Sequence, residues 1–123
     1  MNTDKYLSRR YNIQTYNCAH FAADVWYDLF GYDLSLQLTG FMRKKAEREV
    51  RISSLRAFKK LDCPKSPCFV WLHSRDISHV GVYIDGKVLH IRESGVKLEL
   101  LDTLTIGYKK VTFYDVEHAD HLP

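Results

Sequence analysis

The pair Asp85-Gly86 constrains the fold of this 123-residue chain more than any other feature. It stands between two runs rich in strand-forming residues, 79–84 and 87–92, and Asp-Gly is a strong signal for a two-residue hairpin turn. Each run carries a histidine, His79 in the first and His90 in the second. The register of this hairpin therefore decides whether the two imidazoles share a face of a sheet.

With this pair as the turn, Gly81 lies opposite His90, and His79 lies opposite Arg92. The other pairs of the register are Ile84 with Lys87, Tyr83 with Val88 and Val82 with Leu89. The two histidines are then diagonal neighbours, with backbones about 7–8 Å apart, a gap that two imidazoles can bridge. Gly81 has no side chain to block their approach, and a slip of one residue would separate them.

A second constraint is Asn17-Cys18, which opens a helical pattern. Asn is a favoured N-cap residue and Gly31 stands where a C-terminal cap belongs, so we expect a helix from Cys18 to Phe30. Its apolar residues recur at helical spacing and include Cys18, Phe21, Ala22, Val25 and Leu29. The thiol therefore points toward the rest of the fold.

The remaining patterns place helices first and strands second. The helical signals are a short turn over 4–9, a basic helix over 39–51 and a short helix from Ser53 or Ser54 through Leu55 and Phe58 to Leu61, with a loop or a short turn over 32–38. The strands are expected over 68–73, 79–84, 87–92, 96–100 and 109–116, with breaks at 62–67 and 102–107 and a frayed tail over 117–123. The sequence thus predicts one domain, residues 1–123, of the α+β class: N-terminal helices packed on an antiparallel meander of about four or five strands.

Composition excludes several classes of protein. Hydrophobic residues make up 46% of the chain, and no apolar run approaches the ~20 residues of a membrane-spanning helix. The polar start of the chain shows no secretory signal, so we expect the cytoplasm, or release by a route without such a signal. Nothing marks a nucleic-acid-reading element, so nucleic acid is not an expected partner.

The other cysteines receive a plain interpretation. Three cysteines argue against a disulfide framework. Cys63 and Cys68, with His73 nearby, lack the four closely spaced ligands of a zinc site, so we expect unpaired thiols, no metal and no cofactor. The basic stretch 43–60 is interpreted as a solvated helix face or, alternatively, as a docking surface for an anionic polymer or an acidic partner.

Cys18, His79 and His90 are together suited to nucleophilic catalysis. A helix N-terminus and a nearby imidazolium both lower the pKa of a thiol. We expect Cys18 to be the nucleophile, His79 the general base and later the general acid, and His90 the group that orients His79. The backbone N–H of Cys18 and a tyrosine hydroxyl would stabilise the oxyanion. The alternative is a buried structural thiol with two histidines that serve only packing.

These residues resemble those of the NlpC-type cell-wall cysteine peptidases. That family has a Cys at a helix N-terminus, a His-Val-Gly-Ile-Tyr-like strand, a tight turn and a second His. The matching residues are Tyr16-Asn17-Cys18, His79-Val80-Gly81-Val82-Tyr83 and Val88-Leu89-His90. The resemblance spans 6–114 and implies a papain-like fold. It also implies hydrolysis of peptide bonds in bacterial cell-wall stem peptides, typically between D-glutamate and diaminopimelate.

The resemblance also implies a tyrosine near the oxyanion, before the Cys. Tyr6 falls at that position by count, and Tyr11 is the rival. His20 is offset from the apolar stripe and is expected at the rim of the site, where it would contact the substrate. The family's Asp-Cys-Ser-Gly is replaced here by Asn17-Cys18-Ala19-His20, and its Trp-Gly-Gly stretch is absent. These departures bear on substrate choice.

Small family members without a signal peptide resemble those of bacteriophage tails. This resemblance implies stem peptides of peptidoglycan as substrate and tail-tip proteins as partners. The protein would then occupy the host cytoplasm during assembly and later the virion tail. Two other functions remain open: a structural tail-tip component whose site is dispensable, and a thiol-dependent acyltransferase whose acyl-enzyme is resolved by an amine or alcohol.

Overall fold

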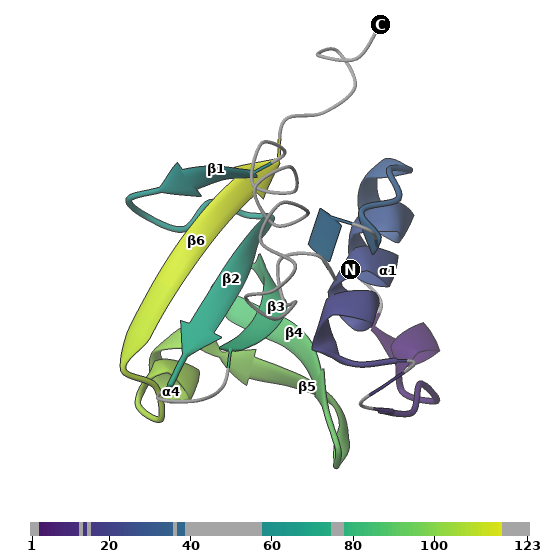
Figure 1. Cartoon of the computed structure of the whole chain (residues 1–123). Coiled ribbons are helices and arrows are strands. Elements are labelled where there is room, and N and C mark those ends of the chain that lie inside the picture. The colour runs from purple at the N-terminus through teal and green to yellow at the C-terminus, as the bar shows by residue number, and fades with distance from the viewer. Residues whose placement is uncertain are drawn as a thin grey trace, which may run out of the picture.

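The computed structural model describes residues 3–12, 14, 16–35, 37–38, 58–74 and 78–116. They form an α+β structure in which helix α1 (Cys18–Phe30) lies against one face of a curved antiparallel sheet (Figure 1). The strands are β1 (Phe58–Leu61), β2 (Cys68–His73), β3 (Ser78–Ile84), β4 (Lys87–Arg92), β5 (Gly95–Leu100) and β6 (Lys110–Val116). The other two elements are the 3-10 turn η1 (Asp4–Tyr6) and the short helix α4 (Leu101–Thr105).

Helix α1 has the bounds that its capping residues predict. The Asn17 side chain accepts a hydrogen bond from the Ala19 N–H at 3.0 Å, and Nδ1 of His20 accepts one from the Asn17 N–H at 3.2 Å. The second of these bonds, with one from the His20 N–H to the Asn17 side chain, closes a capping box around the first turn. At the other end Gly31 takes a left-handed conformation with φ 78°, as a C-terminal cap requires. Cys18 is therefore the first residue of the helix.

The sheet separates a large apolar cluster from a small one. On the α1 side, the rings of Trp26 and Phe69 stack with centroids 4.4 Å apart. Val80, Val82, Leu89 and Ile91 belong to this large cluster. The small cluster consists of Val70, Leu72, Val88 and Leu104. Because both faces are covered, the central strands β2, β3 and β4 are largely buried.

The order of the strands differs from a plain meander. Strands β2 to β5 follow one another as predicted, but β6 pairs with the outer side of β2, and β1 pairs with β6. The described residues thus contain six strands where about four or five were expected. Side chains of β6 pack into both clusters, Tyr114 into the large one and Phe113 into the small one. A strand that is apolar on both sides belongs inside a sheet, and sequence order alone does not show where.

Residues 58–61 form strand β1, so the prediction of a helix through Phe58 to Leu61 was wrong. The buried ring of Phe58 packs edge-on against Phe69 and Trp71, with centroids 5.8 Å away in both cases. This burial and the ladder with β6 outweigh the weak helical tendency of the segment. The expected basic helix over 39–51, the start of the second helix at Ser53 or Ser54, and the tail over 117–123 lie outside the described residues.

Two expected connections contain helical turns. In the predicted loop over 32–38, the Leu38 N–H donates to the Leu34 carbonyl at 2.9 Å. The predicted connection over 102–107 contains most of α4. None of the helices in the described part of the chain is long and apolar enough to cross a membrane.

The hairpin of β3 and β4 has the predicted register next to its turn. Val82 pairs with Leu89, Tyr83 with Val88 and Ile84 with Lys87. Asp85 and Gly86 both have positive φ, at 50° and 87°, as a two-residue turn of this kind requires. The ladder stops at Val82, so the predicted pairs of Gly81 with His90 and of His79 with Arg92 are not formed. The hydrogen-bonded ladder ends there, yet Gly81 and His90 still face each other closely.

This close approach predicts that Gly81→Ala destabilises the protein. A β-carbon at position 81 would lie 2.6 Å from Cγ1 of Val88 and 3.1 Å from Cβ of His90. We expect the variant to lose about 1–3 kcal/mol of unfolding free energy, measured by urea denaturation. Gly107→Ala is the matched control, because its nearest atom is 4.0 Å away. Equal stability of the two variants would contradict the packing described here.

Candidate active site

Three side chains on neighbouring strands form a hydrogen-bonded chain. Nε2 of His79 on β3 lies 2.7 Å from Nδ1 of His90 on β4. Nε2 of His90 lies 2.9 Å from Oε2 of Glu99 on β5. His79 and His90 are 8% and 0% exposed, so each imidazole depends on these bonds for its polar partners. The predicted contact between the two histidines is confirmed, and Glu99 extends it.

The carboxylate of Glu99 determines where the imidazole protons lie. An ionised carboxylate only accepts hydrogen bonds, so Nε2 of His90 donates to Glu99 and Nδ1 of His90 is left as an acceptor. Nε2 of His79 must then donate to Nδ1 of His90. The remaining nitrogen, Nδ1 of His79, carries a lone pair. The chain of bonds therefore presents a proton acceptor on β3.

Burial keeps both rings neutral. Desolvation, the neighbouring His90 and the guanidinium of Arg92 lower the pKa of His79 to about 3. Burial also lowers the pKa of His90, although the hydrogen bond and charge of Glu99 act in the opposite direction. Both imidazoles are thus uncharged near pH 7, and His79 is in the form that can take up a proton.

Cys18 lies at the start of α1, against the part of β3 that is not paired with β4. A hydrogen bond joins its sulfur to the backbone of Val80, the residue that follows His79. Burial raises the pKa of the Cys18 thiol, while hydrogen bonds from the backbone N–H groups of Val80, Ala19 and Cys18 lower it. The described atoms include no hydrogen bond between Sγ and the ring of His79. The raised pKa of Cys18 favours a neutral thiol, and the lowered pKa of His79 favours a neutral imidazole.

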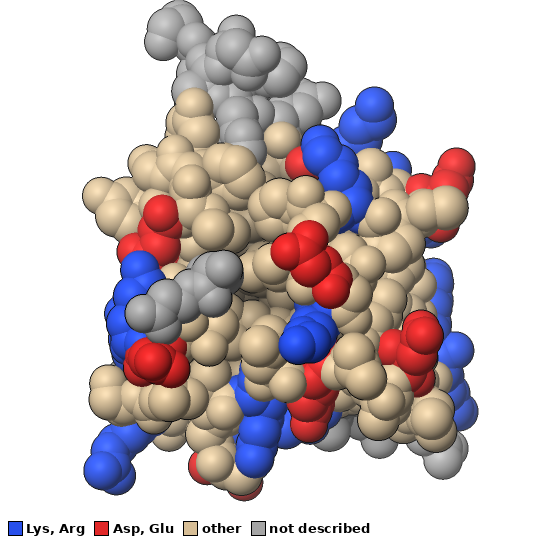
Figure 2. All heavy atoms as spheres, turned by 180° about the vertical axis from the view of Figure 1, so that it is seen from behind, with Lys and Arg blue, Asp and Glu red and all other residues tan. Residues whose placement is uncertain are grey.

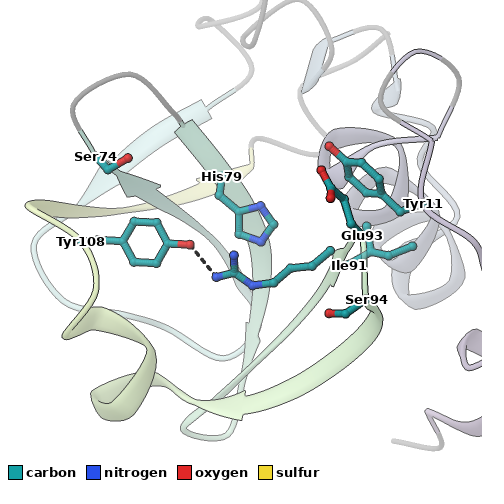
Figure 3. Close-up of a pocket in the computed structure, with 8 residues that line it drawn as sticks. Tyr11, Ser74, His79, Ile91, Glu93, Ser94 and Tyr108 are labelled. Atoms are coloured by element: carbon teal, nitrogen blue, oxygen red, sulfur yellow. Dashed lines mark hydrogen bonds between the residues drawn. The ribbon is translucent and has the colours of Figure 1, made fainter.

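A cavity of about 480 Å³ opens beside the ring of His79. Its lining residues are Tyr11, Ser74, His79, Ile91, Arg92, Glu93, Ser94 and Tyr108. Figure 3 shows the imidazole of His79 projecting between Tyr108 on one side and Tyr11 on the other. A volume of this size lies within the ~300–1,000 Å³ of pockets that hold small ligands. The imidazole of His79 can therefore be reached from solution through this cavity.

The structure separates the two tyrosines that were expected near the oxyanion. Tyr11 lines the cavity, and its pKa is raised by burial and then by its electrostatic interaction with Cys18 and Glu93. Tyr6 is fully buried, and its hydroxyl donates to Oδ2 of Asp28 at 2.7 Å. Asp28 follows Cys18 by about 15 Å along the axis of α1. Tyr11 is thus the tyrosine near the thiol, and Tyr6 belongs to the core.

His20 stabilises the start of α1. Its Nδ1 closes the capping box with Asn17, and its ring stacks on Tyr16 with centroids 6.2 Å apart. It is half-buried and is not among the residues that line the cavity. Its visible role is to position the helix end that carries Cys18, and the expected contact with substrate is not apparent.

The sequence prediction missed three groups at this site: Glu99, and the pair of Arg92 with Tyr108. The position of Glu99 could have been predicted from the sequence, because a turn at Glu93-Ser94 pairs His90 with Lys97. A residue two positions further along β5 lies on the same face, diagonal to His90. The hydrogen bond between Arg92 and Tyr108 joins β4 to the segment after α4, and no local pattern reveals it.

The other two cysteines lie elsewhere and are free. Cys63 is exposed in the loop after β1, and Cys68 is the buried first residue of β2. His73 is bonded to Thr112 at 3.1 Å. Within the described ranges no group of three or more His, Cys, Asp or Glu residues is arranged to hold a metal ion.

The lowered pKa of His79 predicts a loss of stability in acid. The unfolded chain takes up a proton on this ring below its ordinary pKa of 6.5, whereas the folded chain does so only near pH 3. The free energy of unfolding therefore falls as the pH drops through this window. Between about pH 7 and about pH 5, the loss from this ring is about 1–2 kcal/mol. In urea denaturation His79→Gln should lose correspondingly less than the wild type, and equal losses would contradict a buried neutral imidazole.

Comparison with families and with curated proteins found no match to this chain: no model of a protein family matches it, and no curated protein matches it closely enough to count as related.

Proposed function

We propose that this chain is a cysteine hydrolase of the NlpC type, which cleaves peptide bonds in the stem peptides of bacterial peptidoglycan. The observation that carries the proposal is the hydrogen-bonded chain from His79 through His90 to Glu99, next to the backbone that holds the Cys18 sulfur. A papain-like core is part of the proposal. It is supported by a helix that begins with cysteine and packs on the strand that carries the base.

The reaction would proceed by attack of Cys18 Sγ on the scissile carbonyl carbon. The thiol proton passes to Nδ1 of His79 as the C–S bond forms. His79 then protonates the leaving amine as the C–N bond breaks, and Cys18 is left as a thioester. Water hydrolyses the thioester, again with His79 as the base, and the thiol is restored.

The neutral resting pair determines how the thiol is activated. A stored thiolate is disfavoured, so the proton leaves Cys18 only as His79 takes it up. Sγ must also turn away from the Val80 backbone to reach the imidazole. Such rearrangement on substrate binding is common, because catalytic hydrogen bonds often tighten only in the complex.

Two donors are available for the developing oxyanion. The backbone N–H of Cys18 belongs to the first turn of α1, where N–H groups have no partner within the helix, and the proposal requires it to leave the Cys18 sulfur for the oxyanion. The hydroxyl of Tyr11 lines the cavity, and its raised pKa keeps the proton on the oxygen. Together they supply the stabilisation that acyl transfer requires.

We also propose a bacteriophage tail as the setting, with tail-tip proteins as partners and penetration of the cell wall as the role. The support is the resemblance to that family together with the small size of the 123-residue chain, and no single residue carries it.

A second candidate is a structural tail component whose site is dispensable. It is favoured by the 7% exposure of Cys18 and by the absence of a hydrogen bond from its sulfur to His79 in the described structure. Virions that carry Cys18→Ala would then assemble and infect normally.

Digestion of purified muropeptides, followed by mass spectrometry, tests the hydrolase directly. Wild-type protein should release cleaved stem peptides, and Cys18→Ala should reduce the rate by at least about a thousandfold, because the nucleophile is lost. Cys63→Ala is the matched control, since that thiol is exposed and distant from the cavity lining. Uncut wall peptides with wild type, or equal cutting by Cys18→Ala, would refute hydrolysis.

The role of Glu99 can be tested separately. Glu99→Gln removes the charge that orients His90, so we expect the hydrolysis rate to fall about tenfold or more with a smaller change in stability. Nitrogen NMR of the imidazoles should report a changed tautomer at His90 and His79, a readout that a purely structural carboxylate would not move. Asp102→Asn removes a nearby carboxylate on α4 and should alter neither the rate nor the tautomers.

A further inference from the structure

Arg92 lies in the cavity beside the proposed base. Its Nη2 donates a 2.5 Å hydrogen bond to the hydroxyl of Tyr108, drawn as a dashed line in Figure 3. Its positive charge lowers the pKa of both Cys18 and His79, so the guanidinium is close to the two groups that would perform the chemistry. The proposed hydrolysis gives it no role.

The charge of Arg92 is not compensated within the described structure. Its guanidinium forms no ion pair with a described carboxylate, although Glu93 lines the same cavity. Glu99 is bonded to His90 instead. A half-buried guanidinium that faces a cavity without an acidic partner is suited to bind an anion from solution.

The donors at this point converge. Tyr108 accepts its hydrogen bond from Arg92, so the proton of its own hydroxyl is left to donate. Arg92 uses one N–H in that bond and keeps the others of its planar fork. One carboxylate can accept from both side chains, and the fork matches its two oxygens.

We propose that Arg92 and Tyr108 form a subsite for a carboxylate of the substrate. It deepens the proposed hydrolase, on which it rests, because it specifies the substrate class: peptides with a carboxylate close to the scissile bond. The subsite opens into the cavity of His79, and a second hollow that Glu99 lines also reaches Arg92 and Tyr108.

A singly charged carboxylate fits this subsite better than a phosphate. One guanidinium faces the cavity, and the exposed Glu93 would repel a second negative charge. Figure 2 shows acidic and basic side chains interspersed over the face seen there, without a large area of one sign.

Binding to a protein that cannot turn over isolates the subsite from catalysis. Cys18→Ala protein is titrated calorimetrically with N-acetyl-alanyl-glutamyl-alanine amide, in its L- and D-glutamyl forms, and with the matching glutaminyl peptides. We expect at least one glutamyl peptide to bind about tenfold or more tightly than its glutaminyl partner. Arg92→Gln in this background should remove the preference, and Tyr108→Phe should reduce it several-fold.

The controls separate the possible outcomes. Lys97→Gln removes a cation from the neighbouring strand and should leave the preference intact. Thermal unfolding verifies that each variant is folded, and Tyr108→Phe tests the subsite even if Arg92→Gln does not fold. Equal affinity for both peptides, no binding of either, or equally tight binding of inorganic phosphate would overturn the subsite. A preference for glutamyl peptides in a protein that fails to cut muropeptides would refute the hydrolase and keep the subsite.

Discussion

The 2.7 Å hydrogen bond between the rings of His79 and His90 sets the conditions that the surrounding structure satisfies. Two imidazoles can meet at this distance only if one donates and the other accepts. The strands must therefore bring them together without a side chain between them, and Gly81 meets this condition. The proton positions must also be fixed, which requires an acceptor beyond His90, and Glu99 supplies it.

Burial of this network has an energetic cost and a chemical benefit. Polar groups in a low-dielectric interior are costly unless every donor and acceptor is paired. Here three of the four imidazole nitrogens are paired in sequence and Nδ1 of His79 remains as an acceptor, while the carboxylate at the end, 40% exposed, lies partly in water. The same desolvation keeps the base neutral and the thiol protonated. In the proposed hydrolase, the proton transfer would therefore coincide with bond formation.

The sequence predicted the local features of this site, because their signals are local. Asn17 and Gly31 define the helix that positions Cys18, and Asp85-Gly86 defines the hairpin that joins the two histidines. What the sequence could not show depends on contacts between distant segments. The β3–β4 ladder ends at Val82, and the sulfur of Cys18, from another part of the chain, is hydrogen-bonded to the Val80 backbone. The strand at Phe58 and the position of β6 follow from packing across the sheet.

The position of Glu99 on the outermost strand has a consequence for temperature. In the described sheet β5 pairs only with β4, and its residues Leu98 and Leu100 are exposed. Strands at a sheet edge open at a lower free-energy cost than the global unfolding of a domain. The carboxylate that orients the imidazoles is thus held by an edge strand. Local opening of this edge would free His90 from its acceptor while the layer around Trp26 and Phe69 stays packed, so the proposed chemistry would be more sensitive to temperature than the fold.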